Sequence, residues 1–357
     1  MIRIDIETVW RFTRDSAPHS MRVMLDFLNE IRATGKITRA AASANVSYRH
    51  AWNLIEKWSG FFETPLVERR RGHGTQLTAF GEKLVWAGQR LQARLGPQLQ
   101  NLAQELQSEI NALLPGTDHV LRVHASHGFA VSKLRELLDE QGGPAVDFRF
   151  VGNANSLVAL ANDGCDLAGM HLPQGALRQQ AIAACRRLVS AAAHRVIGFV
   201  TREMGLMVRR GNPHGIQGIA DLRNPPVRFV NRDADSGTRV LFDQLLKQAG
   251  IEPARISGYE HGEFTHAAVA AYVASGMADV SFGVEAAARQ FDLDFVRLVT
   301  EDYFFVCRRA MLEKEPLRRI LSVMRSEAFY RAVSELPGYR VNEPGAVLAV
   351  AEVFRIR

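Results

Sequence analysis

The chain has only three cysteines among its 357 residues. Cys165, Cys185 and Cys307 are odd in number and far apart, which argues against disulfides and cysteine metal sites and indicates a reducing compartment. No apolar run approaches the roughly 18 residues that cross a bilayer. The first residues, MIRIDIETVWRF, alternate like a strand and lack the apolar core of a signal peptide. We therefore expect a cytoplasmic protein without membrane contact.

The sequence also lacks the short motifs of common enzyme classes. It has no GxxxxGK[ST] phosphate loop, no complete GxGxxG fingerprint, no GxSxG elbow and no HExxH helix. Its histidines near strand ends are not at metal-ligand spacing. Four acidic residues could do acid–base chemistry, but solvated or capping roles explain them better: Asp163, Asp166, Asp279 and Glu285. We expect no catalytic residues, no metal and no required cofactor.

Charge and length give weaker signals. The chain holds 44 Lys and Arg against 38 Asp and Glu, a net charge of +6, and its length suggests two or three domains. Residues 1–115 hold 15 basic and 11 acidic side chains. This mild excess suits a nucleic-acid partner but decides nothing alone.

Residues 21–78 carry the pattern of a winged helix. The segment 21–32 places its apolar side chains on one helical face. ITRAAASANVSYRHAWNLIEKW, residues 37–58, predicts two helices around the turn NVS, the first capped by Thr38 and the second by Ser47. PLVERRRGHGTQLT, residues 65–78, has apolar ends around a basic, glycine-bearing tip, typical of a hairpin wing.

The second helix and the wing hold the candidate DNA-binding residues. The start of the second helix meets base edges in a helix-turn-helix, so Arg49 could read guanine and Asn53 adenine. The wing arginines would contact phosphate or enter a minor groove. A solvated basic hairpin is the alternative. The predicted interface with double-stranded DNA is Ser47, Tyr48, Arg49, His50, Asn53, Lys57, Arg69, Arg70 and Arg71.

A long helix is predicted from Thr78 to about Leu114. Apolar residues recur along it by threes and fours, as in a coiled coil: Leu91, Leu95, Leu99, Leu102, Leu106, Ile110 and Leu113. Gly96-Pro97 interrupts the pattern and predicts a kink. Because a lone helix with such a stripe is unstable, we interpret it as a dimerisation arm; packing on its own domain is the alternative.

From residue 118 onward strands and helices alternate. This rhythm predicts largely parallel sheets with helices on both faces, which bind ligands beyond the carboxyl ends of their strands. Polar residues follow several strands just before helices begin, where free amides favour an anion. The candidate ligand residues are Ser126, His127, Asn155, Ser156, His171, Asn231, Arg232, Ser236, Gly237, Thr238, Arg239, Thr265 and His266.

These ligand candidates have structural alternatives. Ser126, Ser156 and Thr265 could be plain helix caps. Arg239 could pair with Asp235 or Asp243 on its own helix. An acidic Asp235 beside the site would repel an anion unless it turned away, or it could accept hydrogen bonds from a larger ligand such as a pterin.

Two stretches resemble known families. SYRHAWNLI and LTxxG, within residues 20–90, resemble the N-terminal domain of the ModE family of molybdate-responsive regulators, relatives of LysR-type winged helices. GNANSLVALANDGCDLAGMHLP, GNPHGIQGIADL, FVNRDADSGTR and FTHAAVAAYVASGMADVSFGVEAAA, within residues 119–340, resemble the periplasmic-binding-protein-like domain found beside such winged helices or molybdopterin-biosynthesis domains. ModE carries small oxyanion-binding β-barrels at this point instead.

The resemblance implies a multidomain fold: a mostly-α winged helix-turn-helix (1–77), a linker helix (78–115) and a two-lobed α/β domain of the type II periplasmic-binding-protein class (116–357). Its first lobe would span about 118–200 and 300–357, and its second about 204–299. The implied protein is a homodimer on a palindromic operator; the sequence does not separate a dimer from a tetramer.

The resulting hypothesis is a transcriptional regulator that senses a small anion between its lobes. The resemblance suggests molybdate, tungstate or molybdenum cofactor as the effector. Three alternatives stay open: an organic acid as effector, a partner protein acting on a degenerate cleft, and an enzyme with a DNA-binding-like domain. The sequence does not say whether the ligand activates or represses, or which operator is read.

Overall fold

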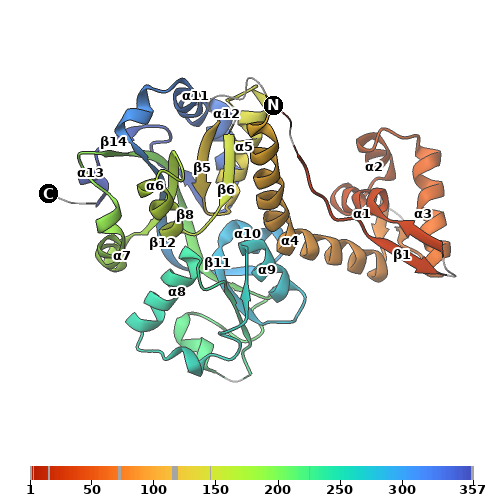
Figure 1. The fold of residues 1–357 in the computed structure, drawn as a ribbon. Coiled ribbons are helices and arrows are strands. Elements are labelled where there is room, and N and C mark those ends of the chain that lie inside the picture. The colour runs from red at the N-terminus through yellow and green to blue at the C-terminus, as the bar shows by residue number, and fades with distance from the viewer. Residues whose placement is uncertain are drawn as a thin grey trace. The chain divides into compact units, whose positions relative to one another are not determined.

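The computed structural model describes residues 2, 4–14, 17–70, 74–114, 120–144, 146–224 and 226–354 (Figure 1). It consists of two compact units. The N-terminal unit is Ile6–Gly96, and the C-terminal unit combines Met1–Asp5 with Pro97–Arg357. The division at Gly96 falls inside the long helix, so the domain boundaries at residues 77 and 115 stay predictions.

The N-terminal unit is a helix-turn-helix with a wing. Its elements are β1 (Arg11–Arg14), β2 (Ala17–Ser20), α1 (Arg22–Thr34), α2 (Ile37–Ser43), α3 (Tyr48–Phe62), β3 (Val67–Arg70) and β4 (Gly74–Leu77). The two wing strands pair antiparallel, as do β1 and β2. Buried Phe27 and Leu28 of α1 pack in one core with Ile55 and Trp58 of α3. The predicted order of three helices and a wing is confirmed.

The two helix caps predicted in this unit had different outcomes. Ser47 caps α3, because its hydroxyl accepts a hydrogen bond from the His50 amide at 3.2 Å. The predicted cap at Thr38 is wrong. Helix α2 begins one residue earlier, at Ile37, which is buried in the core, and Lys36 occupies the cap position without a side-chain hydrogen bond.

Helix α4 (Ala79–Ala112) explains the LTxxG motif. The Thr78 hydroxyl accepts from the Gly81 amide at 3.1 Å, so Thr78 caps the helix. A Cβ on Gly81 would lie 2.2 Å from the carbonyl oxygen of Leu66, the residue before β3. Only glycine therefore permits the first turn of α4 to approach the chain this closely. The helix continues through Pro97.

The C-terminal unit alternates strands and helices. Its first part, up to the long strand β8, contains β5 (Leu121–Ala125), α5 (Phe129–Glu140), β6 (Val146–Phe150), α6 (Asn153–Ala161), β7 (Leu167–Pro173), α7 (Arg178–Cys185) and β8 (His194–Val208). The middle part contains β9 (Phe229–Arg232), α8 (Gly237–Gln248), β10 (Gly262–Glu263), α9 (His266–Ala274), β11 (Val280–Val284), α10 (Glu285–Gln290) and β12 (Asp294–Arg308). The chain then returns through α11 (Glu315–Met324), α12 (Glu327–Ser334), β13 (Tyr339–Val341), β14 (Val347–Leu348) and α13 (Val350–Phe354).

One mixed sheet joins two lobes. Its strand order is β10-β9-β11-β8-β12-β7-β5-β6. Neighbours are parallel within each lobe, β6-β5-β7 in lobe 1 and β10-β9-β11 in lobe 2. The long strands β8 and β12 run antiparallel through both lobes. The expected sheet was largely parallel; the two crossover strands make it mixed. Parallel strands place the starts of α5 and α6, and of α8 and α9, beyond their carboxyl ends.

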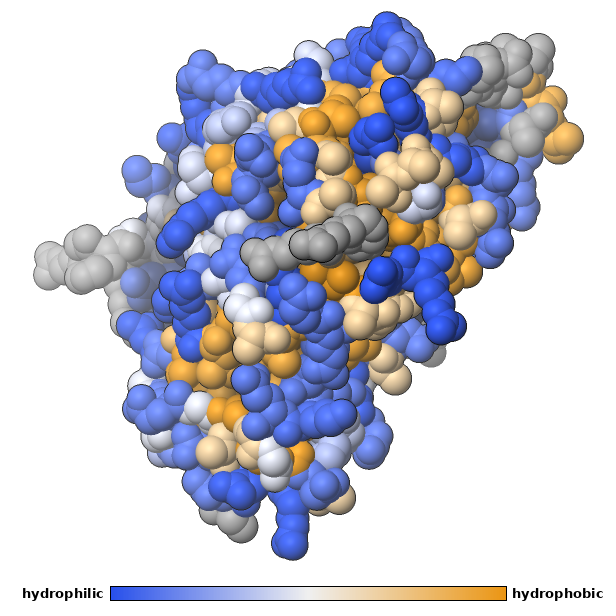
Figure 2. Space-filling view, turned by 90° about the vertical axis from the view of Figure 1, so that its left-hand side faces the viewer, coloured by the Kyte–Doolittle hydropathy of each residue, from blue (hydrophilic) through white to orange (hydrophobic). Residues whose placement is uncertain are grey.

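The end of the chain completes lobe 1. Val350 and Phe354 of α13 are buried in the cluster that contains Val196, Phe304 and Val306. This agrees with the apolar pattern of the C-terminal tail. On the face shown in Figure 2, hydrophobic patches lie among hydrophilic side chains. Among the described residues, no helix is long and apolar enough to span a bilayer.

Candidate functional site

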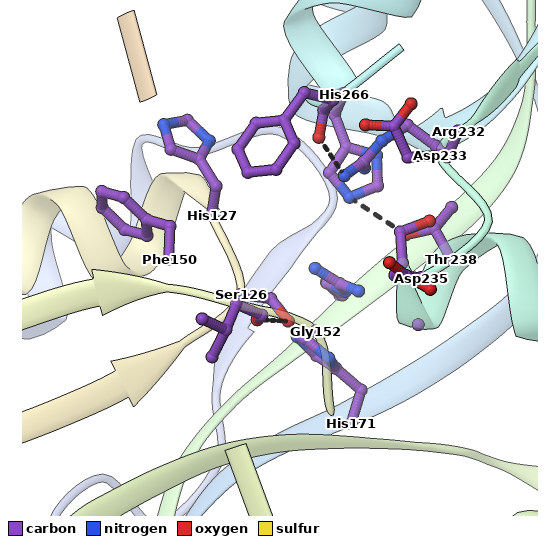
Figure 3. A pocket seen from close by; sticks show the side chains of 15 residues that line it. Ser126, His127, Phe150, Gly152, His171, Arg232, Asp233, Asp235, Thr238 and His266 are labelled. Atoms are coloured by element: carbon purple, nitrogen blue, oxygen red, sulfur yellow. Dashed lines mark hydrogen bonds between the residues drawn. The ribbon is translucent and has the colours of Figure 1, made fainter. Parts of the chain in front are cut away.

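A cavity of about 120 Å³ lies between the two lobes of the C-terminal unit. Figure 3 shows residues of lobe 1, such as Ser126 and His127, facing Arg232 and Thr238 of lobe 2. The complete lining is Ser126, His127, Phe150, Val151, Gly152, His171, Arg202, Arg232, Asp233, Asp235, Ser236, Gly237, Thr238, Phe264 and His266. The volume suits a small ligand rather than a drug-sized one.

Four helices begin at the wall of this cavity. Helices α5 and α6 start directly after lining residues of lobe 1, and α8 and α9 start at lining residues of lobe 2. The first amides of each helix have no partner within that helix, and the helix dipole places partial positive charge there. These helix starts favour an anion, and they act against the two carboxylates of the lining, Asp233 and Asp235.

Arg202 supplies a charge that is already compensated. It lies on β8, is 1% exposed, and donates from Nε (2.9 Å) and Nη2 (2.7 Å) to Glu301 on β12. These two residues face each other across the crossover strands. Buried ion pairs of this kind hold a geometry, since removal of one partner leaves the other charge unmet.

Arg232 supplies a charge that is not compensated in the same way. Its Nε donates to the carbonyl of Glu263 at 3.2 Å and its Nη2 to the carbonyl of Phe264 at 2.6 Å. Both acceptors are neutral, and Nη1 is buried without a hydrogen-bond partner among the described residues. Burial, with Arg202 adding repulsion, lowers the pKa of Arg232 to about 9. The guanidinium stays charged at neutral pH and would be stabilised by an anionic partner.

Three histidines complete the polar wall, and each is neutral at pH 7. Burial lowers the pKa of His127 to about 4, with Arg232 adding repulsion. Burial, then the charges of the two arginines, holds the pKa values of His171 and His266 well below the usual range. His127 lies edge-on against Phe150, and His266 Nε2 is 3.4 Å from the hydroxyl of Thr238.

Asn153, the first residue of α6, fixes His171. Its amide Nδ2 donates to the His171 carbonyl oxygen at 3.3 Å, and its Oδ1 lies 2.7 Å from His171 Nδ1. Nε2 of His171 is buried and has no hydrogen-bond partner in the part of the chain that the structure describes. The only ring nitrogen that this histidine can offer a ligand is therefore Nε2.

The lobes touch beside the cavity through two glycines. A Cβ on Gly152 of lobe 1 would lie 2.3 Å from the carbonyl oxygen of Asp235 in lobe 2. A Cβ on Gly237 of lobe 2 would lie 2.9 Å from Nδ2 of Asn153 in lobe 1. The glycine of the Ser-Gly-Thr-Arg motif thus permits close approach of the other lobe.

The structure brings eight of the thirteen predicted ligand residues together around the cavity: Ser126, His127, His171, Arg232, Ser236, Gly237, Thr238 and His266. Ser236 also caps α8 by accepting from the Arg239 amide at 3.1 Å.

The other five predicted ligand residues lie outside the lining. Arg239 pairs with Asp243 at 3.2 Å and stacks over Tyr259, and Thr265 caps α9. Ser156 bonds back to Gly152 within α6, and Asn155 is exposed. Asn231 donates to the Tyr259 carbonyl at 3.1 Å.

Sequence reasoning missed Arg202, which lies in the middle of an apolar strand. Its partner Glu301 is 99 residues away, so no local pattern joins the two. Phe264 could have been found, because it directly precedes the predicted helix start at Thr265. Asp235, about which the sequence raised a concern, is exposed and lies in the lining. Among the described residues, no group of three histidine, cysteine, aspartate or glutamate side chains is arranged to hold a metal.

In the N-terminal unit six of the nine predicted DNA-binding residues are exposed at or near α3. Ser47, Tyr48, Arg49, His50, Asn53 and Lys57 are exposed on and just before α3.

Arg69 of the wing joins this helix. It donates to the Tyr48 hydroxyl at 3.3 Å and lies 5.0 Å from the ring centre of Trp52. Arg70 ends β3, and its side chain, like all of Arg71, lies outside the described residues.

Two family descriptions match the chain. Residues 134–325, more than half of it, match the PBP superfamily domain, and residues 24–82 match the bacterial regulatory helix-turn-helix protein, lysR family. The first range lies within the cavity-bearing unit, and the second covers most of α1, all of α2 and α3, and the wing.

Individual proteins match different parts. YvgK of Bacillus subtilis is 32% identical over 200 residues, which cover 56% of this chain and 64% of YvgK. The chain thus spans less than two thirds of that relative. The transcriptional regulator ModE of Haemophilus influenzae is 40% identical over 62 residues, which cover 16% of this chain and 24% of ModE. The resemblance to ModE is therefore partial.

Among solved structures, a hydrogen-peroxide-bound variant of OxyR from Corynebacterium glutamicum is 15% identical. The superposition covers 88% of this chain and 94% of the OxyR chain, with a TM-score of 0.44. With its winged helix followed by a two-lobed domain, the chain belongs to the PBP superfamily, and its N-terminal unit matches the helix-turn-helix of the lysR family of bacterial regulatory proteins.

Proposed function

We propose that the protein is a homodimer that binds a palindromic operator through α3 and the wing, and that a small anion between the lobes controls this binding. The observation that carries the proposal is Arg232, a buried guanidinium in the cavity lining. Its hydrogen-bond acceptors are neutral carbonyl oxygens, and its Nη1 has no hydrogen-bond partner among the described residues. Because its target is DNA, the protein would act in the cytoplasm.

The surface of α3 supports the DNA-binding half. Arg49 and Asn53 are exposed one turn apart, the arrangement that reads guanine and adenine edges in a major groove. Arg69 is exposed on the wing beside Tyr48 and would contact a phosphate. We retain Arg70 and Arg71 as further phosphate contacts.

The exposed apolar residues of α4 support the homodimer. Leu102, Leu106 and Ile110 follow each other at intervals of four, and they are 51%, 44% and 42% exposed. Side chains at this spacing share one helical face, and their burial against a second copy would stabilise the dimer. A tetramer would use further surfaces.

The cavity supports an anionic effector. Molybdate, tungstate and molybdenum cofactor are our candidates because the winged helix is similar to ModE, and small organic acids are the alternative class. An effector bound to both lobes would stabilise the closed arrangement, and linkage requires that operator binding respond reciprocally.

Thermal unfolding with molybdate, tungstate, sulfate, phosphate and molybdenum cofactor tests the proposal. An anion at 100 times its Kd stabilises the protein by about 2.7 kcal/mol. The Arg232→Met variant should lose this stabilisation. Arg239→Ala, which removes an arginine outside the cavity, is the matched control and should keep it. No stabilisation by any of these anions or by simple carboxylates would contradict the proposal.

Fluorescence anisotropy on an operator selected by the wild-type protein tests the coupling. An effector that stabilises the protein should change operator affinity, and Arg232→Met should abolish the change. Stabilisation without any change in operator affinity would leave the cavity without a regulatory role.

A further inference from the structure

We propose that His171 Nε2 accepts a hydrogen bond from the effector, so that the effector is an anion carrying its own O–H or N–H group. This inference rests on the proposed function and adds a chemical requirement to it. Among the proposed effectors, molybdenum cofactor and hydroxy acids meet this requirement, whereas the molybdate and tungstate dianions carry no hydrogen and do not. The site would then distinguish between anions of equal charge and similar shape by whether they carry a hydrogen-bond donor.

The orientation of the Asn153 amide fixes which nitrogen of His171 carries hydrogen. Nδ2 is a donor only, and it lies 3.3 Å from the His171 carbonyl oxygen, an acceptor only. The reverse orientation would bring two oxygens together. Oδ1 therefore faces His171 Nδ1 at 2.7 Å, and since Oδ1 can only accept, Nδ1 carries the hydrogen.

The charge state of the ring fixes the character of the other nitrogen. His171 is 3% exposed, Arg202 and Arg232 repel a proton on it, and its pKa lies well below the usual range. A neutral imidazole with hydrogen on Nδ1 has a lone pair on Nε2. Among the described residues that atom is buried and has no hydrogen-bond partner, and His171 belongs to the cavity lining, so Nε2 is an acceptor with unused capacity at this site.

The groups around the ring reinforce this state. Tyr303 of β12 lies 4.0 Å away between ring centres, Arg202 reaches the site from β8 and Arg232 from β9. The neutral Asn153 approaches from α6. Glu301 from β12 is engaged by Arg202. None of these groups supplies a negative charge to the ring, so protonation of Nε2 is disfavoured and a ligand donor is favoured.

Matched pairs of anions test the requirement. At pH 8 monohydrogen phosphate and sulfate both carry two charges and four oxygens, but only phosphate has an O–H. Lactate and propionate differ by one hydroxyl. We expect the hydrogen-bearing member of each pair to bind at least tenfold tighter in isothermal titration calorimetry, without proton uptake when buffers of different ionisation enthalpy are compared. A site that must hydrogen-bond its ligand rejects the analogue that lacks the group.

A substitution at Asn153 tests the cause. Asn153→Asp replaces a neutral acceptor by a carboxylate, which should protonate His171 and turn Nε2 into a donor. The phosphate-to-sulfate affinity ratio should then fall at least tenfold, with sulfate binding as tightly as phosphate or more so. Asn155→Asp adds the same charge on the exposed side of α6 and should leave the ratio unchanged.

The outcomes separate the two proposals. Sulfate or molybdate binding to the wild-type protein as tightly as phosphate, with uptake of one proton, would overturn the role of His171 while leaving an anion sensor. An unchanged ratio in Asn153→Asp would overturn it as well. If no probe binds in an Arg232-dependent manner, the proposed anionic effector fails, and the inference fails with it.

Discussion

The two candidate sites of this protein are built in opposite ways. The candidate DNA-binding surface lies mainly on one continuous helix, on which Arg49 and Asn53 are exposed. The cavity is assembled from segments up to 140 residues apart, between Ser126 and His266, and its arginines are buried. Substitutions at Arg49 and Asn53 should therefore change binding alone, whereas substitutions in the cavity should change binding and folding together.

The largest effect is expected from the buried ion pair. Arg202→Ala leaves Glu301 buried without its partner and should lower the free energy of unfolding by about 3–5 kcal/mol. Urea unfolding followed by circular dichroism measures the change. The double variant Arg202→Met with Glu301→Gln removes both charges and should recover most of the loss. A loss below about 1 kcal/mol in the single variant would remove the contrast between the sites.

The recognition helix should show the reverse pattern. Arg49→Ala should weaken binding to the selected operator by about 1–3 kcal/mol, because one bidentate base contact is lost. All four tryptophans lie in the N-terminal unit, so their fluorescence reports its unfolding. The free energy of unfolding of this unit should change by less than about 0.5 kcal/mol. Arg318→Ala, at an exposed ion pair of the C-terminal unit, should change neither quantity.

Two glycines sharpen the comparison within the N-terminal unit. Gly81→Ala places a methyl group against the Leu66 carbonyl and should lower the free energy of unfolding of the N-terminal unit by about 1–3 kcal/mol. Tryptophan fluorescence measures the change. Gly60→Ala on α3 meets nothing within 4 Å and should stabilise the unit by up to about 1 kcal/mol, because alanine favours a helix. Equal effects would show that the fit around LTxxG does not limit stability.

The cavity histidines predict a dependence on pH. Their pKa values are lowered in the folded state, so below pH 6.5 the unfolded chain binds protons that the folded chain does not. Stability should therefore fall as the pH drops from about 6.5 to about 4, by up to about 1.4 kcal/mol per pH unit for each histidine. The His171→Phe variant should show a smaller fall of the free energy of unfolding with falling pH. Unfolding followed by circular dichroism at several pH values measures this slope. A slope unchanged by this variant would contradict the neutral state of His171.

The sequence predicted the N-terminal unit better than the cavity for a physical reason. Helix periodicity, the Ser47 cap and the basic wing are local signals, and each concerns residues that are close in the chain. Arg239 illustrates the limit. Its place in a helix start suggested an anion contact, but Asp243 and Tyr259 hold it away from the cavity. Arg202 shows the converse, because only the pairing of β8 with β12 reveals its role.

The contact between Gly152 and the Asp235 carbonyl also limits how far the lobes can close. Because there is no room even for a methyl group, further approach of the lobes at this point would bring their backbones into collision, and the cavity would not shrink much below its present volume. An anion that fits this volume bridges both lobes at this contact. A bulkier anion would still reach Arg232 but would hold the glycine away from its partner, so it would occupy the site as an antagonist.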